Sequence, residues 1–213
     1  LAPVRRALDT RTAPVVVFCR DDDAGWDDAR LARLLDVFSE RGVPLDLAVI
    51  PSRASAARAS WLLARQHGRR GRLGVHQHGW AHRNHEPRGR KCEFGPARPI
   101  DAVISDLVRG REAMTHAFGA KCDAIFTPPW NRCVPELGPI LVALGFAVLS
   151  RDHSALPMGC RGLHECPTHV DWSSRRHGTP PDPRAIAAAM ARVAATEDVV
   201  GLLFHHAAMT EDD

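Results

Sequence analysis

Short apolar runs alternate along the chain with longer segments in which apolar residues recur every three or four positions. The short runs predict buried strands over residues 15–19, 45–50, 73–75, 124–126, 147–149 and 199–204. The longer segments predict helices over residues 26–41, 55–67, 100–118, 134–144 and 182–195. Strands that alternate with helices form right-handed βαβ units. The pattern therefore predicts an α/β fold with a mainly parallel sheet, either open or closed into a barrel.

Composition narrows the classes of function. The chain has 213 residues, of which 45% are apolar and 25% charged, as expected for one globular domain over residues 1–213. A formal net charge of +3 is too small to indicate a nucleic-acid partner. No apolar run approaches transmembrane length and no secretory signal precedes the first strand, so we expect no membrane partner and a cytoplasmic protein. The oligomeric state is left open.

Three adjacent carboxylates, Asp21, Asp22 and Asp23, follow the first predicted strand. Carboxylates crowded at a strand end destabilise the fold unless a cation offsets their charge. Since neighbouring side chains point in different directions, one carboxylate can bind a metal while the next faces a water. The alternative is an acidic first turn for the helix that follows, which is the more ordinary interpretation of this cluster alone.

Four histidines, His76, His78, His82 and His85, gather within ten residues after the third predicted strand. Two imidazoles four positions apart, such as His78 and His82, can bind one ion if the chain turns between them. Imidazole combined with carboxylate suits zinc and related divalent ions. The pattern predicts a metal site, with a histidine-rich surface loop as the alternative.

Two further strand ends carry residues suited to chemistry. The fourth predicted strand runs into Pro128-Pro129-Trp130, and because proline has no N–H, Trp130 offers the first free backbone donor. That donor and the large ring suit a wall that contacts an acyl carbonyl and a sugar face. His205 ends the last predicted strand, where it is placed to act as a general acid. A structural turn and a packed core histidine are the respective alternatives.

In this order, the clusters resemble the motifs of the polysaccharide deacetylase family, carbohydrate esterase family 4. The matching segments are Asp22-Asp23, His78-Gly79-Trp80-Ala81-His82, Thr127-Pro128-Pro129-Trp130, Asp171-Trp172 and Leu203-Phe204-His205. Each motif is weak alone, but five in register over residues 15–206 make the resemblance specific. It implies a distorted, incomplete (β/α) barrel. It also implies metal-dependent hydrolysis of an N-acetyl or O-acetyl group on a saccharide.

The resemblance also implies roles for individual residues. Asp23, His78 and His82 would bind one divalent ion, with zinc preferred and cobalt or nickel as alternatives. Asp22 would act as the general base, and His205 would protonate the departing amine. The expected substrate-binding residues are Pro129, Trp130, Asn131, Arg132, Asp171 and Trp172.

Two departures from the family pattern concern the residues around the base and the metal. Thr127 replaces the usual arginine, so the group that orients the base must come from elsewhere, with Arg132 and Arg20 as candidates. Gly79 replaces the usual serine or threonine and removes a hydroxyl. Thr127 keeps two other functions open, a non-catalytic metal-containing carbohydrate-binding relative and a metal hydrolase of a non-sugar amide.

A third departure is the extra carboxylate of Asp21, which leaves the pair Asp21-Asp22 as an alternative register for the first motif. The segment 83–99 is also unusual, because it is long, basic and without periodicity, and follows the histidines directly. Loops of this length in compact domains are often functional lids. Its basic residues would suit an anionic saccharide, and an ordinary solvated loop is the alternative. These residues are Arg83, Arg88, Arg90 and Lys91.

Overall fold

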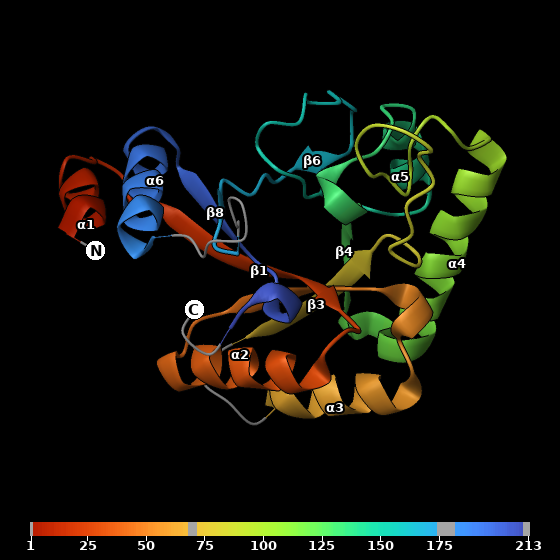
Figure 1. Ribbon diagram of the computed structural model, residues 1–213, viewed down its shortest axis with the longest axis horizontal. Coiled ribbons are helices and arrows are strands. Elements are labelled where there is room, and N and C mark those ends of the chain that lie inside the picture. The colour runs from red at the N-terminus through yellow and green to blue at the C-terminus, as the bar shows by residue number, and fades with distance from the viewer. Residues whose placement is uncertain (1, 68–71, 174–181, 211–213) are drawn as a thin grey trace.

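The computed structural model describes residues 2–67, 72–173 and 182–210, in which eight parallel strands form one sheet in the order β6-β5-β4-β3-β2-β1-β8-β7. The strands are β1 (Val16–Ala24), β2 (Leu45–Val49), β3 (Leu73–His78), β4 (Cys122–Thr127), β5 (Val148–Leu149), β6 (His164–Glu165), β7 (Val170–Asp171) and β8 (Val199–Phe204). The helices are α1 (Ala2–Asp9), α2 (Asp28–Arg41), α3 (Ala56–His67), α4 (Ile100–Phe118), α5 (Leu137–Ala143) and α6 (Pro183–Thr196). Figure 1 shows the helices arranged around the sheet.

The sheet is curled, and the chain between β6 and β7 requires this. These strands lie at opposite ends of the strand order, yet only residues 166–169 separate them. Such a link spans at most about 18 Å, whereas the edges of a flat eight-stranded sheet lie about 34 Å apart. A bridge between Asp152 and Thr168 continues the β5–β6 pairing along this link, and the N–H of His169 donates to the carbonyl of Gly201 on β8 at 2.8 Å. The fold is therefore the predicted distorted, incomplete (β/α) barrel.

Two apolar clusters fill the space between sheet and helices, and α4 contributes to both. Val103 and Leu107, near its start, pack with residues of β4, β5 and α5, whereas Met114 and Phe118, near its end, pack with residues of β1 to β3 and α2. The members of each pair are four positions apart and the pairs are separated by seven, so all four lie on one face of the helix, as an amphipathic helix requires. Among the described helices, none is both long and apolar enough to cross a membrane.

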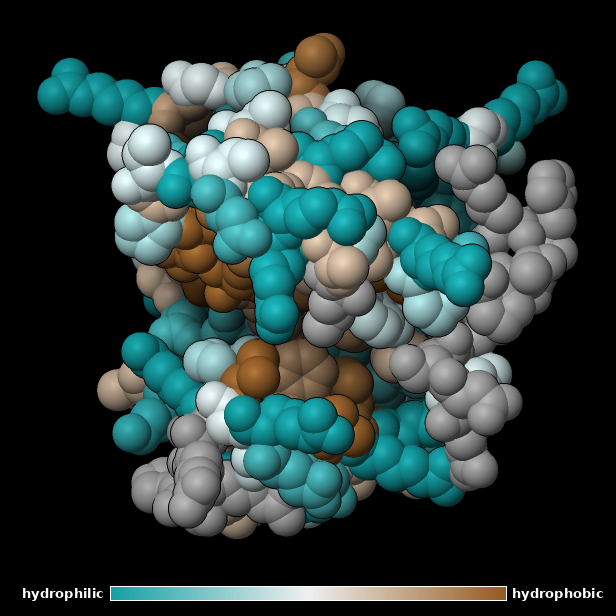
Figure 2. All heavy atoms as spheres, turned by 90° about the vertical axis from the view of Figure 1, so that its left-hand side faces the viewer, coloured by the Kyte–Doolittle hydropathy of each residue, from teal (hydrophilic) through white to brown (hydrophobic). Residues whose placement is uncertain are grey.

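The face that carries α1 and α6 exposes apolar atoms in patches among hydrophilic side chains (Figure 2).

The six predicted strands and five predicted helices are present, with boundaries that shift by a few residues. Two extensions affect the site, since β1 continues through the aspartates to Ala24 and β3 continues to His78. The helix α1 and the strands β6 and β7 were not predicted.

Candidate active site

The end of β1 contains a β-bulge that redirects one aspartate. Between Asp21 and Ala24, β1 advances by three residues while β2 advances by two. Asp23 lies in this bulge with a φ of 70°, a left-handed conformation that destabilises an L-residue by about 1 kcal/mol. Regular alternation would place Asp21 and Asp23 on one face and Asp22 on the other. The bulge instead gives Asp21 and Asp23 different neighbours.

Asp23, His78 and His82 form a cluster of three ligand atoms that all lie within 4.8 Å of one another. Asp23 Oδ1 is 3.3 Å from His78 Nε2 and 3.0 Å from His82 Nε2. Two ligands at ~2.1 Å from a tetrahedral ion are separated by about 3.4 Å, close to these distances. The side chains are only 13%, 1% and 9% exposed, respectively. The donor set and its spacing thus fit one divalent ion.

Hydrogen bonding leaves two atoms of this cluster without a partner. His78 Nδ1 lies 3.0 Å from the carbonyl oxygen of Thr127, and because a carbonyl only accepts, Nδ1 carries the proton. The Nε2 of a neutral His78 is then a free lone pair, as a metal ligand requires. Both His78 Nε2 and Asp23 Oδ1 are buried without a hydrogen-bond partner among the described residues. Such orphaned atoms are rare in folded proteins and favour a cation between them.

Protonation is the alternative means of balancing the charge of this cluster. Burial raises the pKa of Asp23, but the adjacent imidazoles of His78 and His82 outweigh it and hold that pKa below the ordinary value. Burial lowers the pKa of His78, but Asp22 and Asp23 outweigh it and raise that pKa. A divalent ion therefore competes with protons for the same imidazoles, so its affinity rises with pH.

The turn that carries His82 is held by a buried carboxylate. Glu93 is fully buried and accepts hydrogen bonds from the backbone N–H groups of Trp80 at 3.1 Å, Ala81 at 2.8 Å and Arg83 at 3.2 Å. Gly79 and His82, at the two ends of this turn, both have a positive φ, of 58° and 54°. Glu93 was not among the predicted site residues, because it belongs to none of the motifs and lies within the segment 83–99, which has no periodicity.

Two tryptophans flank the ring of His82. Its centroid lies 4.7 Å from that of Trp26 and 4.4 Å from that of Trp130. Trp130 has a φ of 56°, and its backbone N–H has no acceptor within the described part of the chain. Trp26 was interpreted only as the start of a helix, because nothing in the sequence places it next to His82.

The Asp22 carboxylate is paired with Arg20, which lies two residues earlier on the same face of β1. Arg20 Nε donates to Asp22 Oδ1 at 2.8 Å and Arg20 Nη2 to Oδ2 at 3.0 Å. Both side chains are almost fully buried. Burial raises the pKa of Asp22, but the guanidinium of Arg20 outweighs it, and the pKa lies below its ordinary value. Asp22 is therefore an oriented, ionised carboxylate.

The remaining donors of Arg20 fix its own position. Nη1 donates to Ser150 Oγ at 2.7 Å, and Nη2 also donates to Asn131 Oδ1 at 2.8 Å. The other candidate for this role, Arg132, instead donates to the carbonyl of Lys91 at 3.0 Å. Thr127 stands where the family has an arginine, and Arg20 and Arg132 were the candidates to replace that arginine. Of these two, Arg20 contacts Asp22.

His205 follows β8, the strand beside β1. Asp21 pairs with Phe204 in the β1–β8 register, so Asp22 and His205 are neighbours along the two strand ends. His205 Nδ1 lies 3.6 Å from Asp171 Oδ1. Burial lowers the pKa of His205, but Asp171, and after it Asp22, outweigh burial and raise the pKa to about 9. The imidazole of His205 is therefore protonated at neutral pH.

The next residue, His206, has a different environment. Its Nδ1 lies 2.6 Å from Asp21 Oδ2, and its Nε2 lies 2.8 Å from the carbonyl oxygen of Trp26. The His206 backbone N–H also donates to Asp21 Oδ1 at 2.9 Å. Both side chains are fully buried, and both oxygens of the Asp21 carboxylate contact His206. The geometry favours the register Asp22-Asp23 over Asp21-Asp22.

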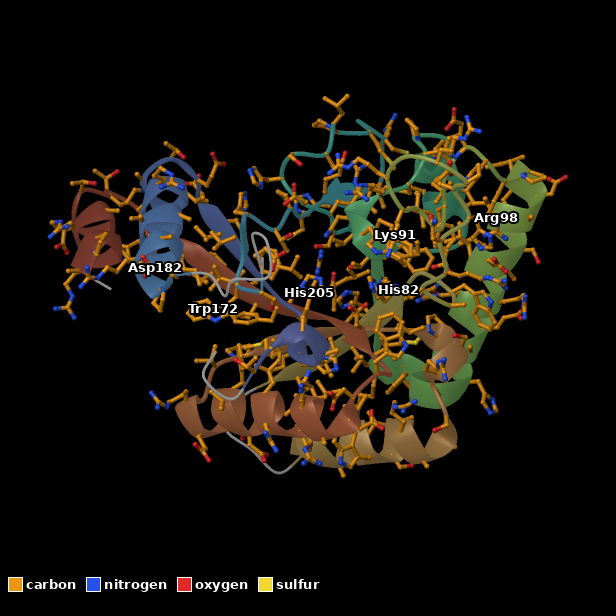
Figure 3. All side chains as sticks on the ribbon, viewed as in Figure 1. His82, Lys91, Arg98, Trp172, Asp182 and His205 are labelled. Carbon is orange, nitrogen blue, oxygen red and sulfur yellow. The ribbon has the colours of Figure 1, made fainter. Side chains whose placement is uncertain are left out.

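The other predicted substrate-binding residues have the following surroundings. Pro129 is buried against Gly79, and Asn131 holds Arg20. Asp171 lies beside His205, whereas the ring of Trp172 stacks on Phe204 with centroids 5.6 Å apart. Figure 3 shows His82 and His205 near the centre of the molecule, with Trp172 on the far side of His205. None of these contacts involves a substrate, so the substrate-binding roles stay predictions.

Comparison with known proteins gives matches among solved structures. No protein-family model and no curated protein matches the sequence. A carbohydrate esterase family 4 (CE4) esterase from Streptococcus mutans superposes with a TM-score of 0.61 at 16% identity, over 96% of this chain and 78% of that one. A putative polysaccharide deacetylase from Mycobacterium smegmatis gives 0.65 at 18% identity, over 92% and 78%.

A third match is a CE4 family pseudoenzyme from Bacillus anthracis, with a TM-score of 0.60 at 14% identity, over 92% of this chain and 56% of that one. At such identities the superpositions establish the fold and leave the chemistry to the residues of this chain. The fold of this chain is therefore that of the CE4 esterases and polysaccharide deacetylases.

Proposed function

We propose that the chain is a metal-dependent deacetylase that hydrolyses an N-acetyl or O-acetyl group on a saccharide. The observation that carries the proposal is the juxtaposition of two groups. Asp23, His78 and His82 offer three ligand atoms for one ion. Asp22, which Arg20 orients, directly precedes Asp23 at the end of β1 and interacts electrostatically with His78. The solved structures with this fold include an acetyl xylan esterase from Clostridium thermocellum in complex with a cobalt ion.

Asp23, His78 and His82 would hold one divalent ion, for which zinc is the first choice and cobalt or nickel are alternatives. When bound, the ion would supply Lewis-acid chemistry that polarises the acyl carbonyl and activates a water. Asp22 takes the proton of the attacking water, a role that suits an ionised carboxylate with fixed orientation. Arg20 is a positioning residue that keeps Asp22 in place.

His205 gives a proton to the departing amine, which suits an imidazole whose pKa is raised to about 9. The backbone N–H of Trp130 stabilises the negative charge that develops on the carbonyl oxygen, as free donors in such sites do. The ring of Trp130, which lies against His82, provides an apolar surface for the sugar. Pro129, Asn131, Arg132, Asp171 and Trp172 remain proposed contributors to the substrate site.

A non-catalytic, metal-containing relative is the second candidate, favoured by Thr127 in place of the family arginine and by the pseudoenzyme among the solved structures of this fold. The paired Arg20 and Asp22 favour catalysis, because Arg20 supplies the guanidinium that Thr127 lacks.

Metal analysis of the purified protein, followed by acetate release from a panel of acetylated saccharides, tests both candidates. We expect one zinc, cobalt or nickel ion per chain and release of acetate, with both lost in His78→Ala. The variant His153→Ala is a matched control, since His153 is an exposed histidine outside the cluster. Bound metal without acetate release would favour the non-catalytic relative, and absence of metal would overturn both.

A further inference from the structure

The basic segment 83–99 is fixed in place by its own polar side chains. Asn84 Oδ1 accepts hydrogen bonds from the backbone N–H groups of Glu86 at 3.1 Å and Cys92 at 2.9 Å. The two acids of the segment also serve its backbone, since Glu86 accepts from the N–H of Ala97 at 3.2 Å and Glu93 accepts from three N–H groups around His82. The carboxylates are thus turned toward the chain.

The cations of the same segment are turned outward. It contains five basic and two acidic residues, so its net charge of +3 equals that of the whole chain. Arg98 is paired with Asp106 at 2.7 Å. The other four basic side chains are exposed, and none of them forms an ion pair within the described part of the chain. These residues are Arg83, Arg88, Arg90 and Lys91.

Lys91 brings this charge to the edge of the candidate active site. Its Nζ lies 6.0 Å from the centroid of the Trp130 ring, which lies 4.4 Å from the ring of His82. Arg132 lies next to Lys91, because its Nη1 donates to the backbone carbonyl of Lys91 at 3.0 Å. In Figure 3, Lys91 lies directly above His82. One wall of the site therefore consists of an aromatic ring bordered by two cations.

These cations crowd one another. Burial, and next the neighbouring charge of Arg90, lower the pKa of Arg132. Cys92, and after it the carboxylate of Asp152, act on the pKa of Arg132 in the opposite sense, but burial and Arg90 outweigh them, and Asp152 Oδ1 accepts hydrogen bonds from the backbone N–H and hydroxyl of Ser154. Like charges held together beside a partly buried site destabilise the protein, and an anion bound between them removes that repulsion.

We propose that the saccharide bound at this site carries an anionic group, a carboxylate or a phosphate, next to the acetylated unit. The group binds to Lys91 and Arg90 while the sugar ring lies on Trp130. The proposal rests on the proposed deacetylase function and adds the class of its substrate. Carboxylate and phosphate share the chemistry that lysine and arginine recognise, so the two are separated by experiment.

The test compares the metal-loaded enzyme on three N-acetylglucosamine oligosaccharides: a neutral one, one oxidised at C6 to carboxylates and one phosphorylated at C6. We expect kcat/KM about tenfold higher for one anionic series than for the neutral one, with the advantage reduced by added salt. The double variant of Lys91→Gln and Arg90→Gln should lose the preference. Arg192→Gln removes an exposed arginine of α6, outside the segment, and should keep it.

Binding separates failure of this inference from failure of the proposed function. Asp22→Asn, loaded with metal, is titrated with the same saccharides and followed by tryptophan fluorescence. If the wild type releases no acetate from any saccharide, the deacetylase proposal fails, and tighter binding of an anionic series still supports the anionic site. Equal kcat/KM and equal binding for neutral and anionic saccharides would overturn the inference, as would loss of the preference in Arg192→Gln.

Discussion

At the scale of single residues, Asp22 is a buried carboxylate that Arg20 holds ionised and oriented. Asp22→Asn keeps the shape of the side chain but removes its basicity, and the three proposed ligands are untouched. We expect the variant to retain metal while kcat falls by about two to four orders of magnitude. Metal content and acetate release, measured on the same preparation, check this. Loss of the metal would show that Asp22 is itself a ligand.

We expect His205 to determine the alkaline side of the pH profile. Its pKa is raised to about 9, so the imidazolium is present at neutral pH and is lost as pH rises through that value. We expect turnover of amide substrates to fall above about pH 9. Asp171→Asn should shift that fall to lower pH, because the variant lacks the carboxylate that raises the pKa of His205.

His205→Ala should abolish the alkaline fall and slow amide substrates far more than activated aryl esters, whose leaving groups need no proton. The profile of kcat against pH for both substrate types is the measurement. Equal slowing of amides and aryl esters would mean that His205 positions the substrate or supports the fold.

At the scale of an element, the turn from β3 to His82 depends on a glycine. Gly79 has a φ of 58°, and a Cβ there would clash with the Glu93 carboxylate and lie 2.6 Å from Pro129 Cδ. Gly79→Ala should therefore lower stability by about 3 kcal/mol, through backbone strain and overpacking, and weaken metal binding by displacing His82. The serine or threonine of the family pattern does not fit this position for the same reason.

Gly89→Ala is the matched control, because Gly89, in the nearby segment 83–99, also has a positive φ, of 80°, and a Cβ there meets nothing within 4 Å. We expect it to lower stability by only about 1 kcal/mol, the backbone contribution alone. Urea unfolding and metal titration of both variants measure the difference. Equal effects would show that the contact with Glu93 and Pro129 is unimportant.

The same elements show what the sequence could predict about the site. Strand ends carry the polar clusters, so Asp22, Asp23, His78 and His82 could be chosen by position and motif. The bulge at Asp23 could not, because three consecutive aspartates give no sign of which step in the register is irregular. Glu93 and Trp26 reach His82 or its turn only through the folded path of the chain, and no local pattern records such contacts.

At the scale of the whole molecule, the alternation of strands and helices predicted a mainly parallel sheet but left open whether it closes, and the family resemblance implied the incomplete barrel. Closure depends on β6 and β7, two residues each, which pair with opposite edges of the sheet. It brings Ser150, after β5, to Arg20 on β1, whereas Asp171 reaches His205 through the direct pairing of β7 with β8. The orientation of the proposed base is therefore a consequence of the curled sheet, and the raised pKa of the proposed acid is a consequence of strand pairing at its edge.

The proposed metal ligands also join parts of the barrel that do not pair directly, because β2 separates β1, which carries Asp23, from β3, which carries His78. An ion that binds only the folded state stabilises it by about 3–4 kcal/mol when it is present at 100 to 1,000 times its Kd. Chelation should accordingly lower the Tm by about 6–16 °C for a domain of this size.

The effect of chelation should depend on pH in a definite direction. Without the ion, the raised pKa of His78 means that its protonated form contributes stability below the unfolded pKa, about 6.5, and that this contribution is lost as pH rises through the folded value. With the ion, binding strengthens as pH rises because protons no longer compete for the imidazoles. The Tm difference between metal-loaded and chelated protein should therefore be larger at about pH 8 than at about pH 6. Calorimetry at both values measures it, with His153→Ala behaving as wild type and His78→Ala showing no response to the chelator. A difference that is constant with pH, or that persists in His78→Ala, would place the ion at other residues.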